Sequence, residues 1–220
     1  MASRVSIAER AGFVQRGLRL EYLTLGWNFL EAVIAVVAGF LAGSTALVGF
    51  GFDSIIECGS GAVLIWRLRT DWDAHRREQL EQAARRLVGA GFLLLAAYVA
   101  IEAASTLLTR REPEHSLPGI LVAIASLIVM PLLARAKRKV AQGLSSGAMR
   151  ADSKQTDLCA YLSAILLGGL VLNWALGWWW ADPVAGLVMV VIIAKEGIEA
   201  ARGEKCACDC DMPVESDGRS

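Results

Sequence analysis

The sequence predicts an all-α polytopic membrane protein with six transmembrane helices and both termini in the cytoplasm. Hydrophobic residues make up 55% of the 220 positions, and they occur in long blocks rather than in amphipathic stripes. Each block holds roughly the 20 residues that a helix needs to cross a bilayer. Charged residues make up only 20% and gather between the blocks. This pattern is typical of a membrane protein rather than of a soluble domain.

The distribution of positive charge predicts the orientation. Lysine and arginine are crowded in residues 67–86 and 135–154, whereas residues 173–182 contain none. Under the positive-inside rule the two basic segments and both termini are cytoplasmic, and we expect a multi-pass protein of the plasma (inner) membrane. Because the basic segments alternate with apolar spans, we do not expect nucleic-acid binding. The first 20 residues lack the apolar core of a cleavable signal peptide.

Three parts are expected along the chain. Residues 1–17 form a cytoplasmic N-terminal segment, residues 18–202 the six-helix membrane domain, and residues 203–220 a short tail rich in cysteine and aspartate. The basic residues 135–150 are expected in a cytoplasmic loop, and tryptophans 174 and 178–180 at the outer interface, where indoles favour the headgroup layer. The expected spans are residues 18–41, 46–68, 87–108, 119–133, 151–172 and 183–198.

The second span carries two acids near its middle, Asp53 and Glu57. A carboxylate at that depth is costly, so such residues normally face a cavity, a partner or an ion. A spacing of four places both on one helical face, one turn apart. Two neighbouring carboxylates repel each other unless protons or a cation neutralise them. Competition between a metal ion and protons for this pair is the simplest explanation for its presence.

The fifth span opens with a second group of polar residues. Asp152, Gln155 and Cys159 recur at i, i+3 and i+7 and are therefore predicted to share one face. An acid, an amide oxygen and a thiol are suitable metal ligands. If this face meets the acidic pair, Asp53, Glu57, Gln155 and Cys159 make a four-coordinate shell. Such a shell suits zinc, and its thiol would also suit cadmium or copper.

These residues resemble the cation diffusion facilitator family over about residues 16–202. The similarity is carried by Asp53-Ser-Ile-Ile-Glu57, by Ala151-Asp152 with Gln155 and Cys159, and by Ala181-Asp182-Pro183. It implies export of divalent metals, commonly zinc, from the cytoplasm in exchange for protons, usually by homodimers. It also implies that the four residues of the shell are the ligands.

Two departures from the family pattern limit what the resemblance implies. Zinc transporters of the family usually have His where Gln155 stands and Asp where Cys159 stands, so zinc selectivity is not implied. Most members also carry a soluble metal-sensing domain after the sixth span. We expect a variant that lacks it, so dimerisation and sensing through that domain are not implied either.

Other residues are named as accessory groups for the metal or for protons. The tail packs three thiols and two acids into six residues, a density that binds soft metals, although a disordered end of no consequence is the alternative. Gln155 could equally bridge helices as an amide, and Cys159 could be a small buried apolar side chain. The accessory set is Asn28, Glu31, Asp152, Cys206, Cys208 and Cys210.

The sequence therefore predicts a divalent transition-metal efflux transporter, zinc first, that works by alternating access with protons moving in the opposite direction. No resident cofactor is expected. A membrane-embedded sensor or scaffold that binds an ion without moving it is the alternative hypothesis. An enzyme is not predicted, because no nucleophile, base and orienting group stand at catalytic spacing.

Overall fold

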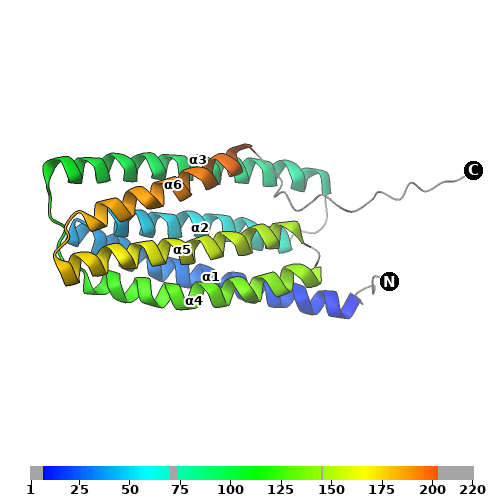
Figure 1. Cartoon of the computed structure of the whole chain (residues 1–220). Coiled ribbons are helices and arrows are strands. Elements are labelled where there is room, and N and C mark those ends of the chain that lie inside the picture. The colour runs from blue at the N-terminus through cyan, green and yellow to red at the C-terminus, as the bar shows by residue number, and fades with distance from the viewer. Residues whose placement is uncertain (1–6, 70–73, 145, 203–220) are drawn as a thin grey trace, which may run out of the picture.

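The computed structural model describes residues 7–69, 74–144 and 146–202, and within them it contains helices and no strands (Figure 1). Five of these helices are long and apolar enough to cross a bilayer. The remaining one, α6, has 22 residues but carries Asp182, Lys195 and Glu196. The all-α polytopic prediction is confirmed. The elements are α1 (Ile7–Ala42), α2 (Thr45–Arg69), α3 (Ala74–Thr109), α4 (Leu117–Leu144), α5 (Gly147–Leu176) and α6 (Ala181–Arg202).

The helices associate in three closely packed pairs: α1 with α2, α4 with α5, and α3 with α6. Helix α2 also contacts α3, α5 and α6, so it occupies the centre of the bundle. In Figure 1 the α3–α6 pair lies on one side, and α1 and α4 lie on the other. Helices α1, α2, α4 and α5 thus form a four-helix group with α3 and α6 packed against it.

The helices extend farther than the apolar blocks suggested. Helix α1 is continuous from Ile7, so the described part of the polar N-terminal segment and the first span form one helix. Helix α4 continues to Leu144, and α5 begins at Gly147. The prediction of a loop over residues 135–150 was therefore wrong for most of its length. The helix persists because a basic sequence can form helix readily when one of its faces packs against neighbours.

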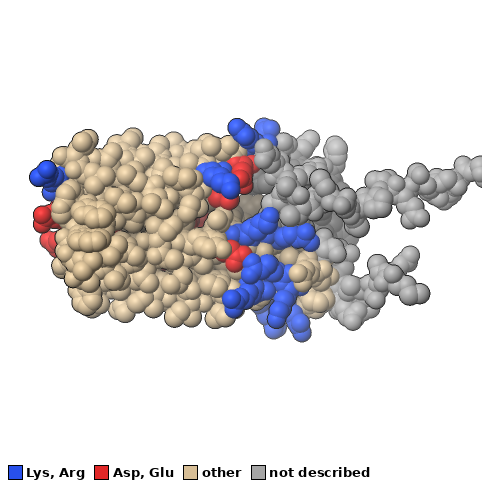
Figure 2. All heavy atoms as spheres, viewed as in Figure 1, with Lys and Arg blue, Asp and Glu red and all other residues tan. Residues whose placement is uncertain are grey.

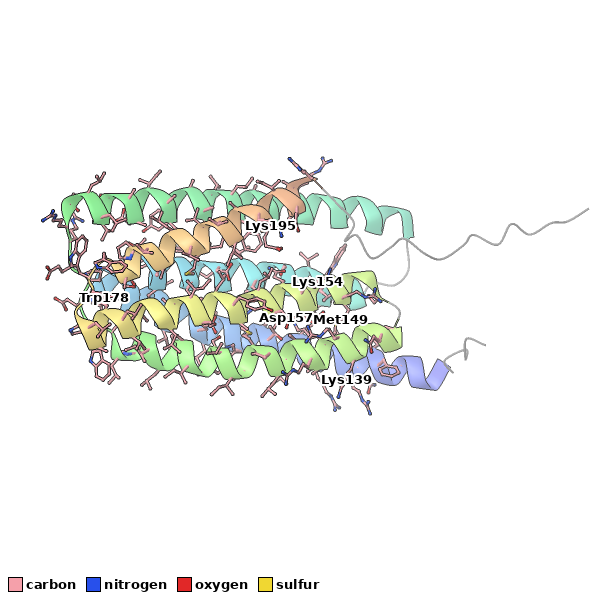
Figure 3. The ribbon with its side chains drawn as sticks, viewed as in Figure 1. Lys139, Met149, Lys154, Asp157, Trp178 and Lys195 are labelled. Atoms are coloured by element: carbon pink, nitrogen blue, oxygen red, sulfur yellow. The ribbon has the colours of Figure 1, made fainter. Side chains whose placement is uncertain are left out.

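The side chains on the outside of the bundle suit a bilayer. Large apolar side chains such as Phe29, Leu94 and Leu121 are exposed on the outside of the bundle. Figure 2 shows charged atoms gathered near the two ends, with a broad uncharged middle. We call the end where α1 begins the basic end, because Lys139 and Lys154 are exposed there (Figure 3). At the opposite end the exposed rings of Trp178 and Trp180 stack with centroids 5.1 Å apart.

Helices α1 and α2 approach so closely that a side chain is excluded at Gly51. A Cβ atom there would lie 2.9 Å from the backbone nitrogen of Val36 and 2.6 Å from its Cγ2 atom. Gly59, on the same helix, has nothing within 4 Å. Comparing alanine substitutions at these two glycines therefore separates the effect of helix packing on stability from the effect of intrinsic helix propensity.

We predict that Gly51→Ala lowers the stability of the bundle by about 1–3 kcal/mol, because the added methyl group forces the two helices apart. Gly59→Ala should leave it unchanged or slightly higher, since alanine favours helix more than glycine does. Thermal unfolding of both variants in detergent, followed by size-exclusion chromatography, measures the difference. Equal unfolding temperatures would contradict the close approach.

Candidate functional site

A column of buried polar side chains runs through the four-helix group from the basic end towards the middle. On α1 it consists of Glu21, Thr24, Asn28 and Glu31, each no more than 3% exposed. Their spacing of three and four places them on one face. The other helices contribute Ser54 and Glu57 from α2, Ser126 and Lys137 from α4, and Asp152, Thr156, Cys159 and Ser163 from α5.

Glu31 collects donors from all four helices of the group. Its Oε1 atom accepts hydrogen bonds from Ser54 Oγ at 2.6 Å and from Cys159 Sγ at 3.6 Å. Its Oε2 atom accepts from Trp27 Nε1 at 2.8 Å and from Ser126 Oγ. Charged acceptors strengthen such bonds. Glu31 therefore ties α1, α2, α4 and α5 together near mid-bundle.

Glu57 lies nearer the basic end than Glu31 and is only partly satisfied. Its Oε1 atom accepts a hydrogen bond from Thr156 Oγ1 at 3.2 Å. Its Oε2 atom has no partner among the described residues, although the residue is only 3% exposed. A buried carboxylate oxygen without a donor is costly. Glu21 also has one unpartnered oxygen, but its other oxygen pairs with Lys137, so Glu57 is the one of these two acids without an ion pair.

The antiparallel register of α1 and α2 places Asn28 level with Glu57. Ser54 bonds to Glu31, and Cys58 Sγ contacts the carbonyl of Leu25 at 3.7 Å, so the intervening residues of the two helices face each other. Neither the oxygen nor the nitrogen of the Asn28 side chain has a partner among the described residues. Two incompletely satisfied polar groups therefore lie at one depth in the bundle.

Below Glu57, towards the basic end, the column contains a fully buried lysine. Lys137 Nζ lies 2.6 Å from Asp152 Oδ2 and 3.2 Å from Glu21 Oε2, and it donates to Thr156 Oγ1 at 3.3 Å. Through Thr156 this network joins Glu57. Asp152, which was predicted as an accessory group, is therefore part of an ion pair that the sequence did not reveal.

The predicted ligands are placed as follows. Asp53 is 6% exposed, and the carboxylates of Glu57, Glu31 and Glu196 act on it electrostatically. Cys159 is buried, whereas Gln155 is half-buried and its Oε1 atom accepts from Ser60 Oγ at 3.0 Å.

The four ligands are not gathered around one point. Among the described residues no three His, Cys, Asp or Glu side chains converge as a metal site requires. The four-residue shell therefore stays a prediction, and the tail cysteines Cys206, Cys208 and Cys210 lie outside the described residues.

Sequence reasoning missed several members of the column. The stripe of Glu21, Thr24, Asn28 and Glu31 was readable, because four polar residues at helical spacing stand within an apolar span. Lys137 was hidden among other basic residues. Thr156, the neighbour of Gln155, was not singled out.

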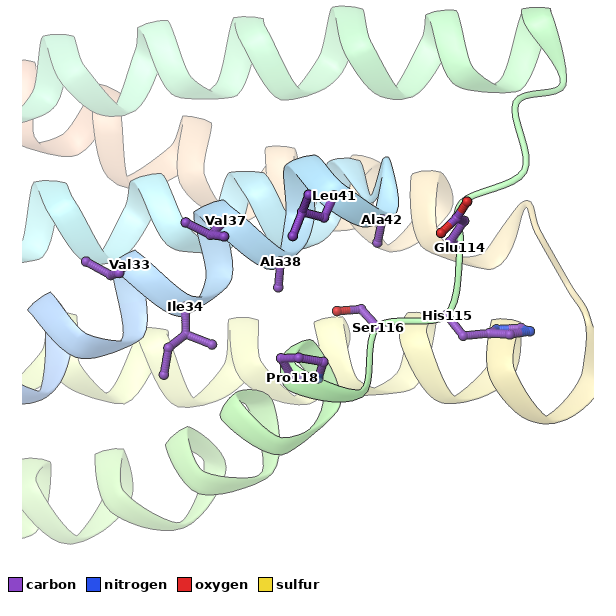
Figure 4. A pocket seen from close by; sticks show the side chains of 10 residues that line it. All are labelled: Val33, Ile34, Val37, Ala38, Leu41, Ala42, Glu114, His115, Ser116 and Pro118. Atoms are coloured by element: carbon purple, nitrogen blue, oxygen red, sulfur yellow. The ribbon is translucent and has the colours of Figure 1, made fainter.

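A hollow at the end opposite the basic end approaches Glu31. It measures about 420 Å³ and lies between aliphatic residues of α1 and the segment from Glu114 to Pro118 (Figure 4). A second hollow of about 300 Å³ shares Ile34 and Pro118 with it and is lined by Glu31. Glu114, His115 and Ser116 supply the polar part of the wall of the first hollow, and the rest of its wall is apolar.

Acids buried in a lipid-facing helical bundle mark ion or proton pathways, so the fold and the interior column define an integral-membrane protein of the cation-transporting class. The model of the cation efflux transmembrane domain matches residues 22–203. The chain therefore belongs to that family, as its resemblance to the cation diffusion facilitators predicted. It is a family of transporters rather than of enzymes.

Two relatives agree with this assignment. The chain is 25% identical over 201 residues to transmembrane protein 163 of Xenopus laevis, an alignment that covers 90% of this chain and 70% of the relative. It is 26% identical over 171 residues to an uncharacterized transporter of Synechocystis sp., covering 75% of this chain and 55% of the relative. The chain thus spans about half the length of the second relative.

We predict that Glu31→Leu lowers the stability of the bundle by about 1–3 kcal/mol, because Ser54, Ser126 and Trp27 lose their common acceptor. Glu31→Gln should cost less, since an amide oxygen still accepts. Denaturation of the purified variants in detergent tests this order. If the two variants are equally stable, Glu31 does not hold the four helices together.

Proposed function

We propose that the protein exports a divalent transition-metal ion, zinc first, from the cytoplasm in exchange for protons by alternating access. The family assignment supports cation transport. The observation that carries the metal proposal is Glu57, a buried carboxylate with one oxygen unpartnered, one turn from the buried Asp53. A cation held between the two would neutralise charges that otherwise repel each other.

The proposed ligands are Asp53, Glu57, Gln155 and Cys159. Asp53 and Glu57 supply hard oxygen donors, and Cys159 supplies a soft sulfur donor once it loses its proton. The Nε2 atom of Gln155 has no partner among the described residues, so its amide can be reoriented without breaking a bond of that nitrogen. Asn28 lies at the same depth as Glu57, and Glu31 lies one turn farther from the basic end. Both would be accessory groups.

Proton exchange follows from the chemistry of these ligands. Carboxylates and a thiol must be deprotonated before they bind a metal, so binding releases protons and reprotonation releases the metal. Asp53, Glu57 and Cys159 can each bind a proton, whereas Gln155 cannot. We therefore propose that the site exchanges fewer protons for each metal ion than a site with His in place of Gln155. Assembly as a homodimer in the plasma (inner) membrane is part of the proposal.

The alternative is a membrane-embedded sensor or scaffold that binds the ion without moving it. It is favoured by one observation: the proposed ligands do not converge in this conformation. Equilibrium binding measured together with flux separates the two functions. Metal binding by purified protein, combined with no metal movement into proteoliposomes under any pH gradient, would establish the sensor and refute the transporter.

We predict that proteoliposomes take up zinc or cadmium when a pH gradient is imposed, and that Asp53→Asn or Glu57→Gln reduces the rate at least about tenfold, because each removes a charged ligand. Asp157→Asn is the matched control, since that acid lies on α5 but pairs with Arg138 at the half-exposed surface. Uptake that persists in both site variants would exclude the proposed site.

We predict that Cys159→Asp shifts the metal preference towards zinc and away from cadmium, because an oxygen donor replaces a soft sulfur donor. The ratio of initial zinc and cadmium uptake rates in the same proteoliposomes measures this shift. Cys58, two turns from Gly51 on α2, lies against the α1 backbone, so Cys58→Asp would disturb helix packing and does not serve as a control. Cys159→Ser is used instead and reports loss of the thiol alone. An unchanged ratio in both variants would remove Cys159 from the site.

A further inference from the structure

Lys137 is buried completely at the point where the polar column approaches the basic end. We propose that Lys137 is the cytoplasmic gate of the transport path. Its ammonium closes the column below Glu57 in this conformation and must leave Asp152 before a metal ion can pass. The proposal rests on the transport function proposed above, and it names the residues that separate the ion site from the cytoplasm.

The ion pairs hold three helices together at this level. Lys137 belongs to α4, Glu21 to α1 and Asp152 to α5, with ammonium–carboxylate distances of 3.2 and 2.6 Å. Stability alone does not account for such a network, because apolar side chains of similar volume commonly stabilise a core as well or better. A charged bridge that can be broken and remade is instead suited to two alternating conformations.

An apolar seal lies beside the lysine on the side of the basic end. Leu64 of α2, Val140 and Ala141 of α4, and Met149 of α5 form a buried cluster separate from the main core. Leu20 of α1 packs against it. All four helices of the group thus contribute to a closure between Lys137 and the basic end. An ion could cross this layer only if the helices moved apart.

The lysine lies where an ion bound for Glu57 must pass. Thr156 Oγ1 accepts from Lys137 Nζ at 3.3 Å and donates to Glu57 Oε1 at 3.2 Å, so one hydroxyl separates the ammonium from the acid. The lysine charge acts on Glu57 as well as on Glu21 and Asp152. A divalent ion and the ammonium would repel each other strongly at this distance. The ion can therefore reach Glu57 only when Lys137 moves away.

Cys159 provides a native reporter for the gate. It is 1% exposed and lies one turn beyond Thr156, on the far side of Lys137 from the basic end. In a background where Cys58, Cys206, Cys208 and Cys210 are replaced by Ser, a membrane-impermeant maleimide added to inside-out vesicles reports access from the cytoplasm. We expect Cys159 in the Lys137→Met variant to be labelled at least about tenfold faster than in the parent, because an open state that is normally minor becomes populated.

Matched variants separate gating from a general loss of packing. Lys139→Met removes the same charge from an exposed site two residues along α4 (Figure 3). Cys159 in this variant should be labelled at the parental rate. Lys137→Arg keeps the charge and should restore protection. If Lys137→Met does not fold, the double variant Lys137→Met with Asp152→Asn removes one charge of each sign and serves in its place.

The labelling result is independent of metal flux. Faster labelling of Lys137→Met, with protection in Lys137→Arg, supports the gate even if proteoliposomes show no transport, in which case only the proposed function fails. Labelling of Lys137→Met at the parental rate overturns the gate. Equal acceleration in Lys139→Met also overturns it, because surface charge would then suffice.

Discussion

A carboxylate inside a lipid-facing bundle must be neutralised by a cation, a proton or several hydrogen-bond donors, because water is not available to solvate it. The column meets this demand differently at three depths. Towards the basic end, Lys137 pairs with both Glu21 and Asp152, one positive charge for two acids. At mid-bundle, hydroxyl, indole and thiol donors surround Glu31. Between these levels Glu57 keeps an unpartnered oxygen, and the demand there is unmet.

This unequal compensation gives the column a direction. The level of Glu57 is separated from the basic end by an ion-paired lysine and an apolar seal. On the other side, the main apolar core fills the bundle with side chains such as Leu47, Phe50 and Leu166. The hollow that Glu31 lines is otherwise walled by apolar side chains. The two sides of Glu57 therefore differ in kind: an ion-paired charge and a small apolar cluster lie towards the basic end, and the larger apolar core lies away from it.

The sequence predicted the parts of the fold that local pattern determines. Apolar blocks of bilayer length identified the helices, and the two acids within one of them were rightly expected to be buried in the bundle. The burial of Lys137 could not be predicted, because a lysine among other basic residues looks the same whether it faces solvent or a neighbouring helix. Only the packing of α1 and α5 against α4, with Glu21 and Asp152 opposite, distinguishes it from the exposed Lys139.

The placement of Gln155 and Thr156 shows the same limit at finer scale. Successive residues of a helix lie about 100° apart around its axis, so an error of one residue changes which side chain faces the site. In this conformation Thr156 occupies the place beside Glu57, while Gln155 bonds to Ser60. Binding by the proposed ligand set would therefore need the amide oxygen of Gln155 to leave Ser60 and turn towards Glu57. The side chain has some freedom for that turn, because its Nε2 atom has no partner among the described residues.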